Sequence, residues 1–168
     1  LTWKGFVRSG AQLRADDQKC LVEINEQLAS LGTTFAQNVL ADENEYALVL
    51  ESDDDLVGLP DFLVSSMSAA AEERGHGGKH AVILSRSIIE SFLTFSACRD
   101  LREKAFRAWV ARGEGAGDRD NRPIVAEMVR LRAEKAALLG YESFAHFKLD
   151  NTMAKTPAAV RTLLETVW

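Results

Sequence analysis

The chain has 168 residues, of which 46% are hydrophobic and 27% are charged, a composition typical of a soluble globular protein. Its net charge of −5 argues against a nucleic-acid partner, because phosphate binding requires clustered Lys and Arg. No apolar run has membrane length and no signal peptide is recognisable, so we expect no membrane partner. Cys20 and Cys98 are interpreted as buried free thiols, which together with these absences favours the cytoplasm.

The first half of the chain contains one long predicted helix and two short predicted strands. Residues 1–10 resemble the end of an earlier element, and apolar residues at spacings of three and four predict a helix over 16–42. Apolar runs predict strands over 46–51 and 80–85, with a helix over 60–74 between them. Parallel and antiparallel pairing of these strands both stay open. The long helix carries a stripe of Leu21, Ile24, Leu28, Leu31, Phe35 and Val39, which we interpret as packing within a helical domain rather than as a coiled coil.

The segment 84–113 has the strongest pattern of the chain. Its second half predicts a helix with Ser96 as the N-cap and with one apolar face, on which Trp109 is expected to be buried. Its first half is a dense apolar patch, too short for a membrane span, that must pack against neighbouring helices. The patch comprises Ile88, Ile89, Phe92, Leu93 and Phe95, and the helix face comprises Leu101, Ala105, Phe106, Trp109 and Val110.

Three further helices are predicted after a Gly-rich loop at 113–120. They cover 121–140, 143–149 and the stretch from 156 to the end. Asn121 with Pro123, Ser143, and Thr156 with Pro157 provide the start signals, and the buried face of the first helix comprises Ile124, Met128, Leu131 and Leu138.

The sequence therefore predicts a mainly α fold, a packed helical domain with one small two-stranded β-sheet. We expect residues 1–168 to share one joined core, and a division into sub-regions 1–112 and 121–168 is the alternative. The chain begins with Leu1 and stops within an unfinished helix pattern, so we expect a fragment of a larger protein. We also expect the fragment to self-associate through the apolar residues of that helix, which are Val160, Leu163, Leu164, Val167 and Trp168.

We assign no catalytic and no metal-binding residue, and we leave substrate-binding residues unassigned. Of the three histidines, only His76 and His80 have the spacing of two ligands on one helix, but the residues between them are Gly-Gly-Lys, which disfavour a helix and supply no general base. His146 has no partner histidine one turn away. The glycines at 75–78 and 113–117 are interpreted as plain turns, the paired carboxylates as helix caps, and neither cysteine has an identifiable histidine partner.

The helix within 84–113 also carries several basic side chains that could attract an acidic partner. Asp100 and Glu103 neutralise much of that face, so we interpret it as a solvated helix surface. The basic residues are Arg99, Arg102, Lys104, Arg107 and Arg112.

Many short stretches, in the right order along nearly the whole chain, resemble the thimet oligopeptidase family of zinc metallopeptidases. The stretches 85–90 (SRSIIE) and 92–96 (FLTFS) resemble its bacterial peptidyl-dipeptidase branch in particular. The others are residues 31–33 (LGT), 37–40 (QNVL), 58–60 (GLP), 131–134 (LRAE) and 138–141 (LLGY), together with Asn121, Pro123, Ile124, Lys148, Thr156 and Pro157.

This resemblance implies a parent enzyme that cuts short peptides and releases dipeptides from their C-termini. In that family an H-E-x-x-H helix late in the chain binds zinc, and an earlier helical part walls a channel that admits only short peptides. The motif is absent from this sequence. The resemblance thus implies a channel-wall segment that packs against the catalytic part of the same chain and binds no zinc itself. The alternative is a non-enzymatic helical module that binds other proteins.

Overall fold

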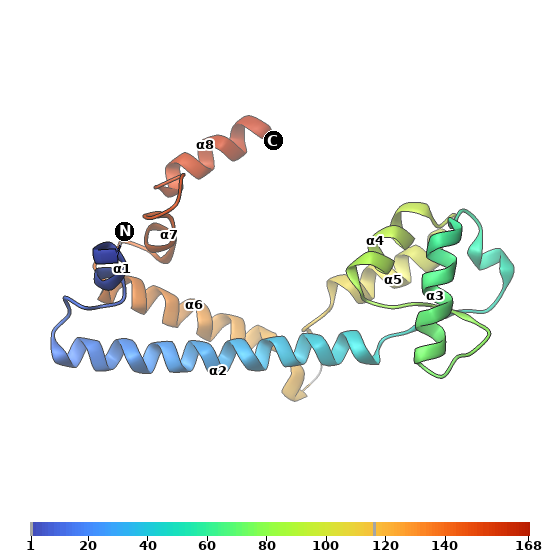
Figure 1. Ribbon diagram of the computed structural model, residues 1–168, viewed down its shortest axis with the longest axis horizontal. Coiled ribbons are helices and arrows are strands. Elements are labelled where there is room, and N and C mark those ends of the chain that lie inside the picture. Colours follow the sequence, from blue (N-terminus) through green and yellow to red (C-terminus); the bar gives the residue numbers. More distant parts are fainter. Residues whose placement is uncertain (1, 116) are drawn as a thin grey trace. The chain divides into compact units, whose positions relative to one another are not determined.

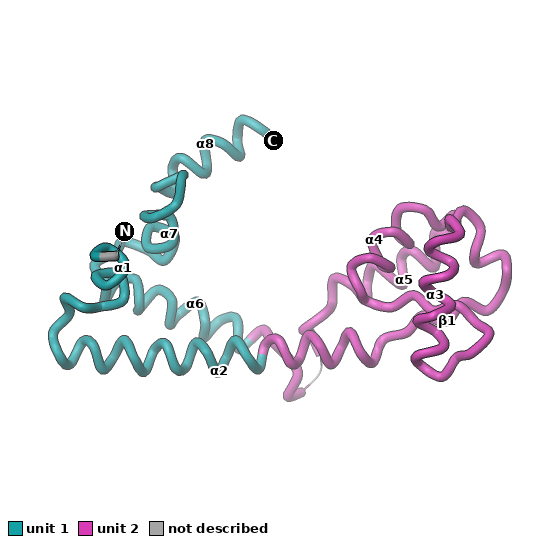
Figure 2. The backbone as a smooth tube through the Cα atoms, in the orientation of Figure 1, with its two compact units in different colours: residues 1–34, 123–168 teal, residues 35–122 magenta. Residues whose placement is uncertain are grey.

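The computed structural model describes residues 2–115 and 117–168 and forms two compact units (Figures 1 and 2). Unit 1 combines residues 1–34 with 123–168, and unit 2 comprises residues 35–122. The predicted mainly α fold with one small two-stranded sheet is confirmed. No helix in the described part of the chain is long and apolar enough to cross a membrane. The reading of residues 1–168 as one fragment, with or without sub-regions, stays a prediction.

Unit 1 is entirely helical. It contains α1 (Thr2–Arg8), the first part of α2 (Ala15–Glu45), most of α6 (Asn121–Leu138), α7 (Phe144–Leu149) and α8 (Pro157–Val167). Within this unit α6 lies along α2 (Figure 1), and the Nζ of Lys135 on α6 donates to the Oδ1 of Asn25 on α2. The most buried apolar side chains of the pair are Leu21 and Ile24 from α2, and Leu131 and Ala136 from α6.

The starts of the last two helices agree with their sequence signals. Ser143 is the N-cap of α7 and accepts from the backbone N–H of His146. Thr156 is the N-cap of α8 and accepts from the N–H of Ala159. A side chain that satisfies one of the free N–H groups at a helix start stabilises that start, so these boundaries follow from local sequence.

Unit 2 is built on β1 (Leu48–Leu50) and β2 (His80–Val82). The strands pair antiparallel, with Leu48 opposite Val82 and Leu50 opposite His80. The segment between them contains a 3₁₀ turn (Asp53–Leu56) and α3 (Asp61–Glu73). After α3 the chain reverses through Gly75 and Gly78, both at φ +78°, a conformation that glycine adopts without strain. This reversal returns the chain to β1 in the opposite direction, which settles the pairing that the sequence left open.

The core of unit 2 lies between this sheet, α3, α4 (Arg86–Phe95) and α5 (Arg99–Val110). The apolar patch expected to be buried is confirmed for Ile88, Ile89 and Phe92, while Leu93 is half-buried and Phe95 is 46% exposed. The largest fully buried side chains of the unit are Phe92, Leu63, Met67, Ile89 and Val82.

The predicted N-cap of α5 is wrong. Helix α5 starts at Arg99 with Cys98 as N-cap, whereas Ser96 ends α4 and its Oγ accepts from the N–H of Cys98. The turn between the helices is fixed from outside, because the N–H of Ala97 donates to Val57 O at 2.9 Å. A Cβ on the neighbouring Gly58 would lie 2.5 Å from Phe95 O. The helix start is therefore set by a tertiary contact rather than by the local cap signal.

The predicted apolar face of α5 is buried on one side only. Ala105 is fully buried and Leu101 partly, but Phe106 and Val110 are 52% and 55% exposed. Trp109, expected to be buried, is half-buried, and the guanidinium carbon of Arg112 lies 3.3 Å from its ring centroid. Within unit 2, α5 packs mainly against α4. This packing buries only one stripe of the apolar side chains of α5 and leaves the others exposed.

Candidate functional site

The three histidines lie in different local settings. His76 lies exposed in the turn before β2, and His80 is half-buried on β2 itself. His146 lies on α7, where its Nδ1 is 2.9 Å from the Oγ of its own N-cap, Ser143. Among the described residues no group of three or more His, Cys, Asp or Glu side chains is placed to hold a metal ion. Since protein zinc sites use three or four such ligands around one ion, the donors present here do not fit zinc.

The sequence assigned no catalytic or binding role to the two cysteines or to the glycine-rich stretches. The structure places them as follows. Cys20 and Cys98 are free and partly buried. Gly75 and Gly78 belong to the turn before β2. Gly113 lies in the loop that precedes α6, where its N–H donates to the Oδ2 of Asp42 at 2.7 Å. That carboxylate would repel a phosphate, so the interpretation of a plain turn is the better one.

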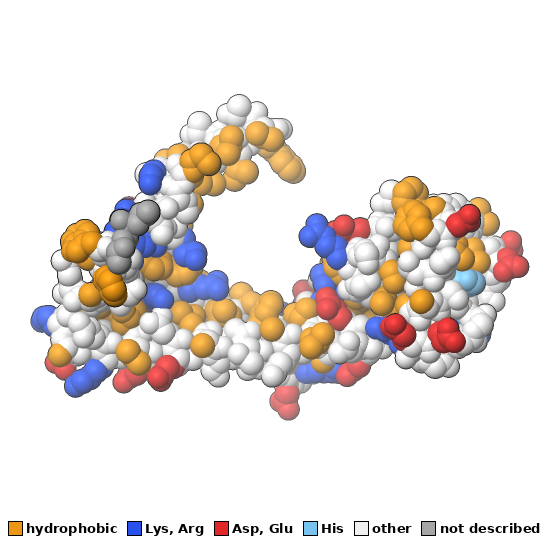
Figure 3. Space-filling view, viewed as in Figure 1, with side chains coloured by type: hydrophobic (Ala, Val, Ile, Leu, Met, Phe, Trp, Pro, Cys, Tyr) orange, Lys and Arg blue, Asp and Glu red, His pale blue; other side chains and the backbone are white. Residues whose placement is uncertain are grey.

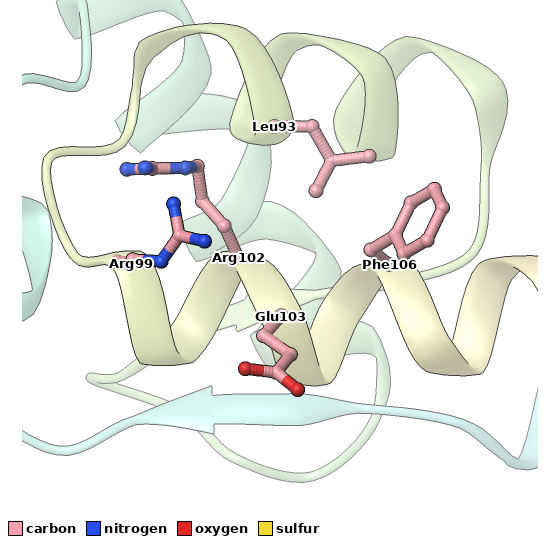
Figure 4. Close-up of a pocket in the computed structure, with 5 residues that line it drawn as sticks. All are labelled: Leu93, Arg99, Arg102, Glu103 and Phe106. Atoms are coloured by element: carbon pink, nitrogen blue, oxygen red, sulfur yellow. The ribbon is translucent and has the colours of Figure 1, made fainter.

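A surface groove between α4 and α5 brings Leu93 of α4 beside side chains near the start of α5. It has a volume of about 420 Å³ and is lined by Leu93, Arg99, Arg102, Glu103 and Phe106. Leu93 and Phe106 point toward one another at one end, and the guanidinium groups of Arg99 and Arg102 lie side by side at the other (Figure 4). One wall is therefore apolar and the other cationic. A volume of this size is within the range of small-molecule and peptide-residue sites.

The cationic end of the groove is not neutralised from within. The carboxylate of Glu103 points away from the arginines (Figure 4) and is paired with Arg107, at 2.8 Å from its Nε and 2.7 Å from its NH2. Arg102 donates to the backbone oxygen of Ser96. Within residues 2–115 and 117–168, Arg99 has no carboxylate in ion-pair distance. The groove therefore keeps two positive charges with open hydrogen-bonding capacity.

The positions of Arg99 and Arg102 in the sequence, rather than the overall charge of the helix, indicate that these arginines have a function. Arg99 and Arg102 lie in the first turns of α5, where the partial positive charge of the helix N-terminus disfavours cations. They are also three residues apart, a spacing at which like charges on a helix repel. Asp100 offsets part of this cost. Basic residues at the unfavourable end of a helix indicate a functional requirement more strongly than the same residues elsewhere on its surface.

Unit 1 contains a second polar cluster, centred on Asp150 just after α7. Its carboxylate accepts from Lys4 Nζ at 2.8 Å, from Tyr141 Oη at 3.0 Å and from Arg8 NH1 at 3.0 Å. The hydrogen bond from Lys4, then those from Tyr141 and Arg8, lower the pKa of Asp150 to about 2. The guanidinium of Arg8 also lies 4.4 Å from the ring centroid of Phe147. All these groups satisfy one another, so the cluster fastens α1 to α7 and offers no free site.

Comparison with known proteins gives the family context. Residues 92–168 match peptidase family M3, whose members are zinc metallopeptidases. The matching region includes α5 and every residue of the groove between α4 and α5.

The similarity to curated proteins extends further along the chain. The chain is 32% identical over 162 residues to "Dipeptidyl carboxypeptidase" of Escherichia coli, an alignment covering 96% of this chain and 24% of that protein. It is 31% identical over 165 residues to "Oligopeptidase A" of Salmonella typhimurium, with the same 96% and 24% coverage. It is 29% identical over 162 residues to "Probable cytosolic oligopeptidase A" of Arabidopsis thaliana, covering 93% of this chain and 23% of that protein.

The similarity does not distinguish between the dipeptidyl carboxypeptidase and the oligopeptidase A. The identities to the dipeptidyl carboxypeptidase and to the oligopeptidase A differ by a single percentage point. The chain spans about a quarter of the length of the curated relatives it matches. Residues 92–168 match peptidase family M3, and the chain is similar along almost all of its length to a dipeptidyl carboxypeptidase and to oligopeptidase A.

Proposed function

We propose that this chain is the helical channel-wall segment of a zinc metallopeptidase that hydrolyses short peptides. The observation that carries the proposal is the similarity to family M3 peptidases over 96% of the chain but only 24% of the relative. The segment would limit access to short, unfolded peptides and shield the reaction from bulk water, while contributing no bond chemistry. Its partner would be the catalytic part of the same protein, and the cytoplasm would be its location, as in the relative named a cytosolic oligopeptidase.

The zinc ligands of such an enzyme would lie outside these 168 residues. This placement is supported by the described residues, among which no group of three or more His, Cys, Asp or Glu side chains is placed to hold a metal ion. Within the family, we place the enzyme in the peptidyl-dipeptidase branch, which releases dipeptides from peptide C-termini. The support is the pair of stretches at 85–90 and 92–96 and the similarity to the E. coli dipeptidyl carboxypeptidase.

The experiment compares the complete protein with residues 1–168 alone. We expect the complete protein to cleave short peptides and to lose activity with a chelator, and we expect residues 1–168 to hold no zinc after chelator washing and to cleave nothing. Mass spectrometry of the products tests the branch, since a peptidyl-dipeptidase releases C-terminal dipeptides and an oligopeptidase cuts internally. One tightly held zinc per 168-residue chain, with chelator-sensitive cleavage, would overturn the proposal.

A second candidate is a non-enzymatic helical module that binds other proteins. The observation that favours it is the exposed apolar side chains of α8, with Leu163 63% and Val167 79% exposed. Solvent-exposed apolar helix faces are a common means of binding other helices. A complete protein that binds no zinc and cleaves no peptide, but forms a stable complex through α8, would support this candidate instead.

A further inference from the structure

We propose that the groove between α4 and α5 binds the C-terminal residue of a peptide, with Arg99 and Arg102 receiving its α-carboxylate and with Leu93 and Phe106 receiving its apolar side chain. The choice of a peptide as ligand rests on the proposed function. The groove itself indicates which part of a peptide binds there, because it has one cationic end and one apolar end.

The cationic end has the properties of a carboxylate receptor. A guanidinium presents several N–H donors in a fixed plane and binds a carboxylate through two parallel hydrogen bonds. The guanidiniums of Arg99 and Arg102 lie side by side at the groove (Figure 4). Glu103, the only acidic residue of the lining, is already paired with Arg107. An anion from outside would therefore add the counter-charge that the groove lacks, and it would relieve the repulsion between the two arginines.

The apolar end is formed by two side chains from different helices. Leu93 comes from α4 and is half-buried, and Phe106 comes from α5 and is 52% exposed. They converge on the same space (Figure 4). An apolar ligand group placed between them would remove the exposed face of Phe106 from water, which is favourable in proportion to the area covered.

The juxtaposition of these two ends selects a peptide terminus over other anions. A C-terminal residue carries its α-carboxylate and its own side chain on the same Cα, so one apolar residue supplies both groups at short range. An internal Asp or Glu presents its carboxylate at the tip of its only side chain and leaves the apolar end without an occupant. A free phosphate would likewise use the arginines alone. The preferred ligand is thus a peptide that ends in Leu, Phe or a similar residue with a free carboxylate.

The test measures binding of short N-terminally labelled peptides to the 168-residue chain by fluorescence anisotropy. Three peptides are compared: one ending in a free Leu, the same peptide with an amidated end, and an amidated peptide with one internal Asp. We expect the free acid to bind about tenfold or more tightly than either amide, because only the free terminal carboxylate forms hydrogen bonds between charged groups with the arginines. We also expect a peptide ending in Gly to bind more weakly than one ending in Leu.

Variants assign the binding to the groove. Arg99 is exposed and has no ion-pair partner among the described residues, so Arg99→Gln should weaken binding of the free acid about tenfold without altering the fold. Phe106→Ala should reduce the preference for Leu over Gly. The matched control is Lys104→Gln, which removes the same charge from an exposed position of the same helix outside the lining and should leave binding unchanged. Circular dichroism verifies that each variant is folded.

The outcomes separate this inference from the proposed function. Equal binding of free acid and amide, or an equal effect of Arg99→Gln and Lys104→Gln, overturns the inference even if the complete protein cleaves peptides. Tight binding of the amidated peptide with the internal Asp also overturns it, since the site would then recognise acidic segments. Selective binding of the free acid by a protein that hydrolyses no peptide would support the inference about the groove and refute the proposed peptidase function.

Discussion

Leu131 and Trp109 are both on predicted apolar faces, but their burial differs. Leu131 is 1% exposed on α6, whereas Trp109 is half-buried on α5. Leu131→Ala should lower the free energy of unfolding by about 2–5 kcal/mol, the usual cost of emptying a buried leucine site. Trp109→Ala should cost less, because part of the ring already faces water. Urea unfolding followed by circular dichroism gives both values, and a larger loss for Trp109→Ala would contradict the half-buried position.

Asn38 and Asn121 are buried polar side chains, 8% and 3% exposed. Asn38 Nδ2 donates to Asn121 Oδ1 at 2.9 Å, and Asn121 Nδ2 donates to Phe35 O at 3.1 Å. Asn121→Ala leaves the amide of Asn38 buried without this partner and should cost about 1–3 kcal/mol. The effects of Asn121→Ala and Asn38→Ala should be clearly less than additive in the double variant, since both remove one interaction. Additive losses in urea unfolding would show that the pair is not coupled.

At the residue scale, the sequence predicted the helix starts that depend only on neighbouring residues. Ser143 and Thr156 cap their helices as expected, because the capping hydrogen bond joins residues three apart. Asn121 was recognised only as a helix start. Its hydrogen bond to Asn38, 83 residues away in sequence, depends on how α6 meets the end of α2, and no sequence spacing encodes that.

The joint between α1 and α7 is an element-scale contact whose strength should depend on pH. The hydrogen bonds from Lys4, Tyr141 and Arg8 lower the pKa of Asp150 to about 2 from its ordinary 3.8. Because the folded-state pKa lies below the unfolded one, this contribution to stability is fully present above about pH 4 and is lost as the pH falls through 2. Stability should therefore drop below about pH 4, which urea unfolding at a series of pH values would measure.

The control for this prediction is a pair of variants. Asp150→Asn removes the titrating group and should remove its part of the stability loss between pH 4 and pH 2. Glu165→Gln, at an exposed position of α8, should leave that loss in place. Identical pH profiles for the parent chain and Asp150→Asn would mean that other carboxylates dominate and that Asp150 does not fasten α1 to α7.

Elements were predicted better than their contacts. Most helices and both strands lie where hydrophobic periodicity and turn residues indicated, although the strands are shorter, at Leu48–Leu50 and His80–Val82. Helices α1 and α4 were not predicted as helices. The groove between α4 and α5 was missed, because its apolar end forms only when Leu93 of α4 packs beside Phe106 of α5. The two arginines at the start of α5 were the sequence signal for this groove. The signal was missed because the acidic residues of the same helix were counted as neutralising its basic residues.

Several large apolar side chains of α8 are exposed. Leu163, Leu164, Val167 and Trp168 are 63%, 61%, 79% and 108% exposed, and hydrophobic side chains run along this helix in Figure 3. Soluble monomers rarely expose contiguous apolar patches larger than a few hundred Å². The net charge of −5 opposes association only weakly at physiological salt, where exposed charges are screened beyond about 8 Å.

We therefore predict that the 168-residue chain self-associates through α8, most simply as a two-fold dimer that uses the same patch on both copies. Sedimentation velocity across a dilution series should show a concentration-dependent dimer. Leu164→Gln combined with Val167→Gln should shift it toward monomer, because the patch loses apolar area on both copies. Val129→Gln replaces a side chain of similar exposure, 59%, on α6, and should leave the equilibrium unchanged. A strict monomer at high concentration that binds no hydrophobic dye would show that α8 is covered by the chain's own residues in solution.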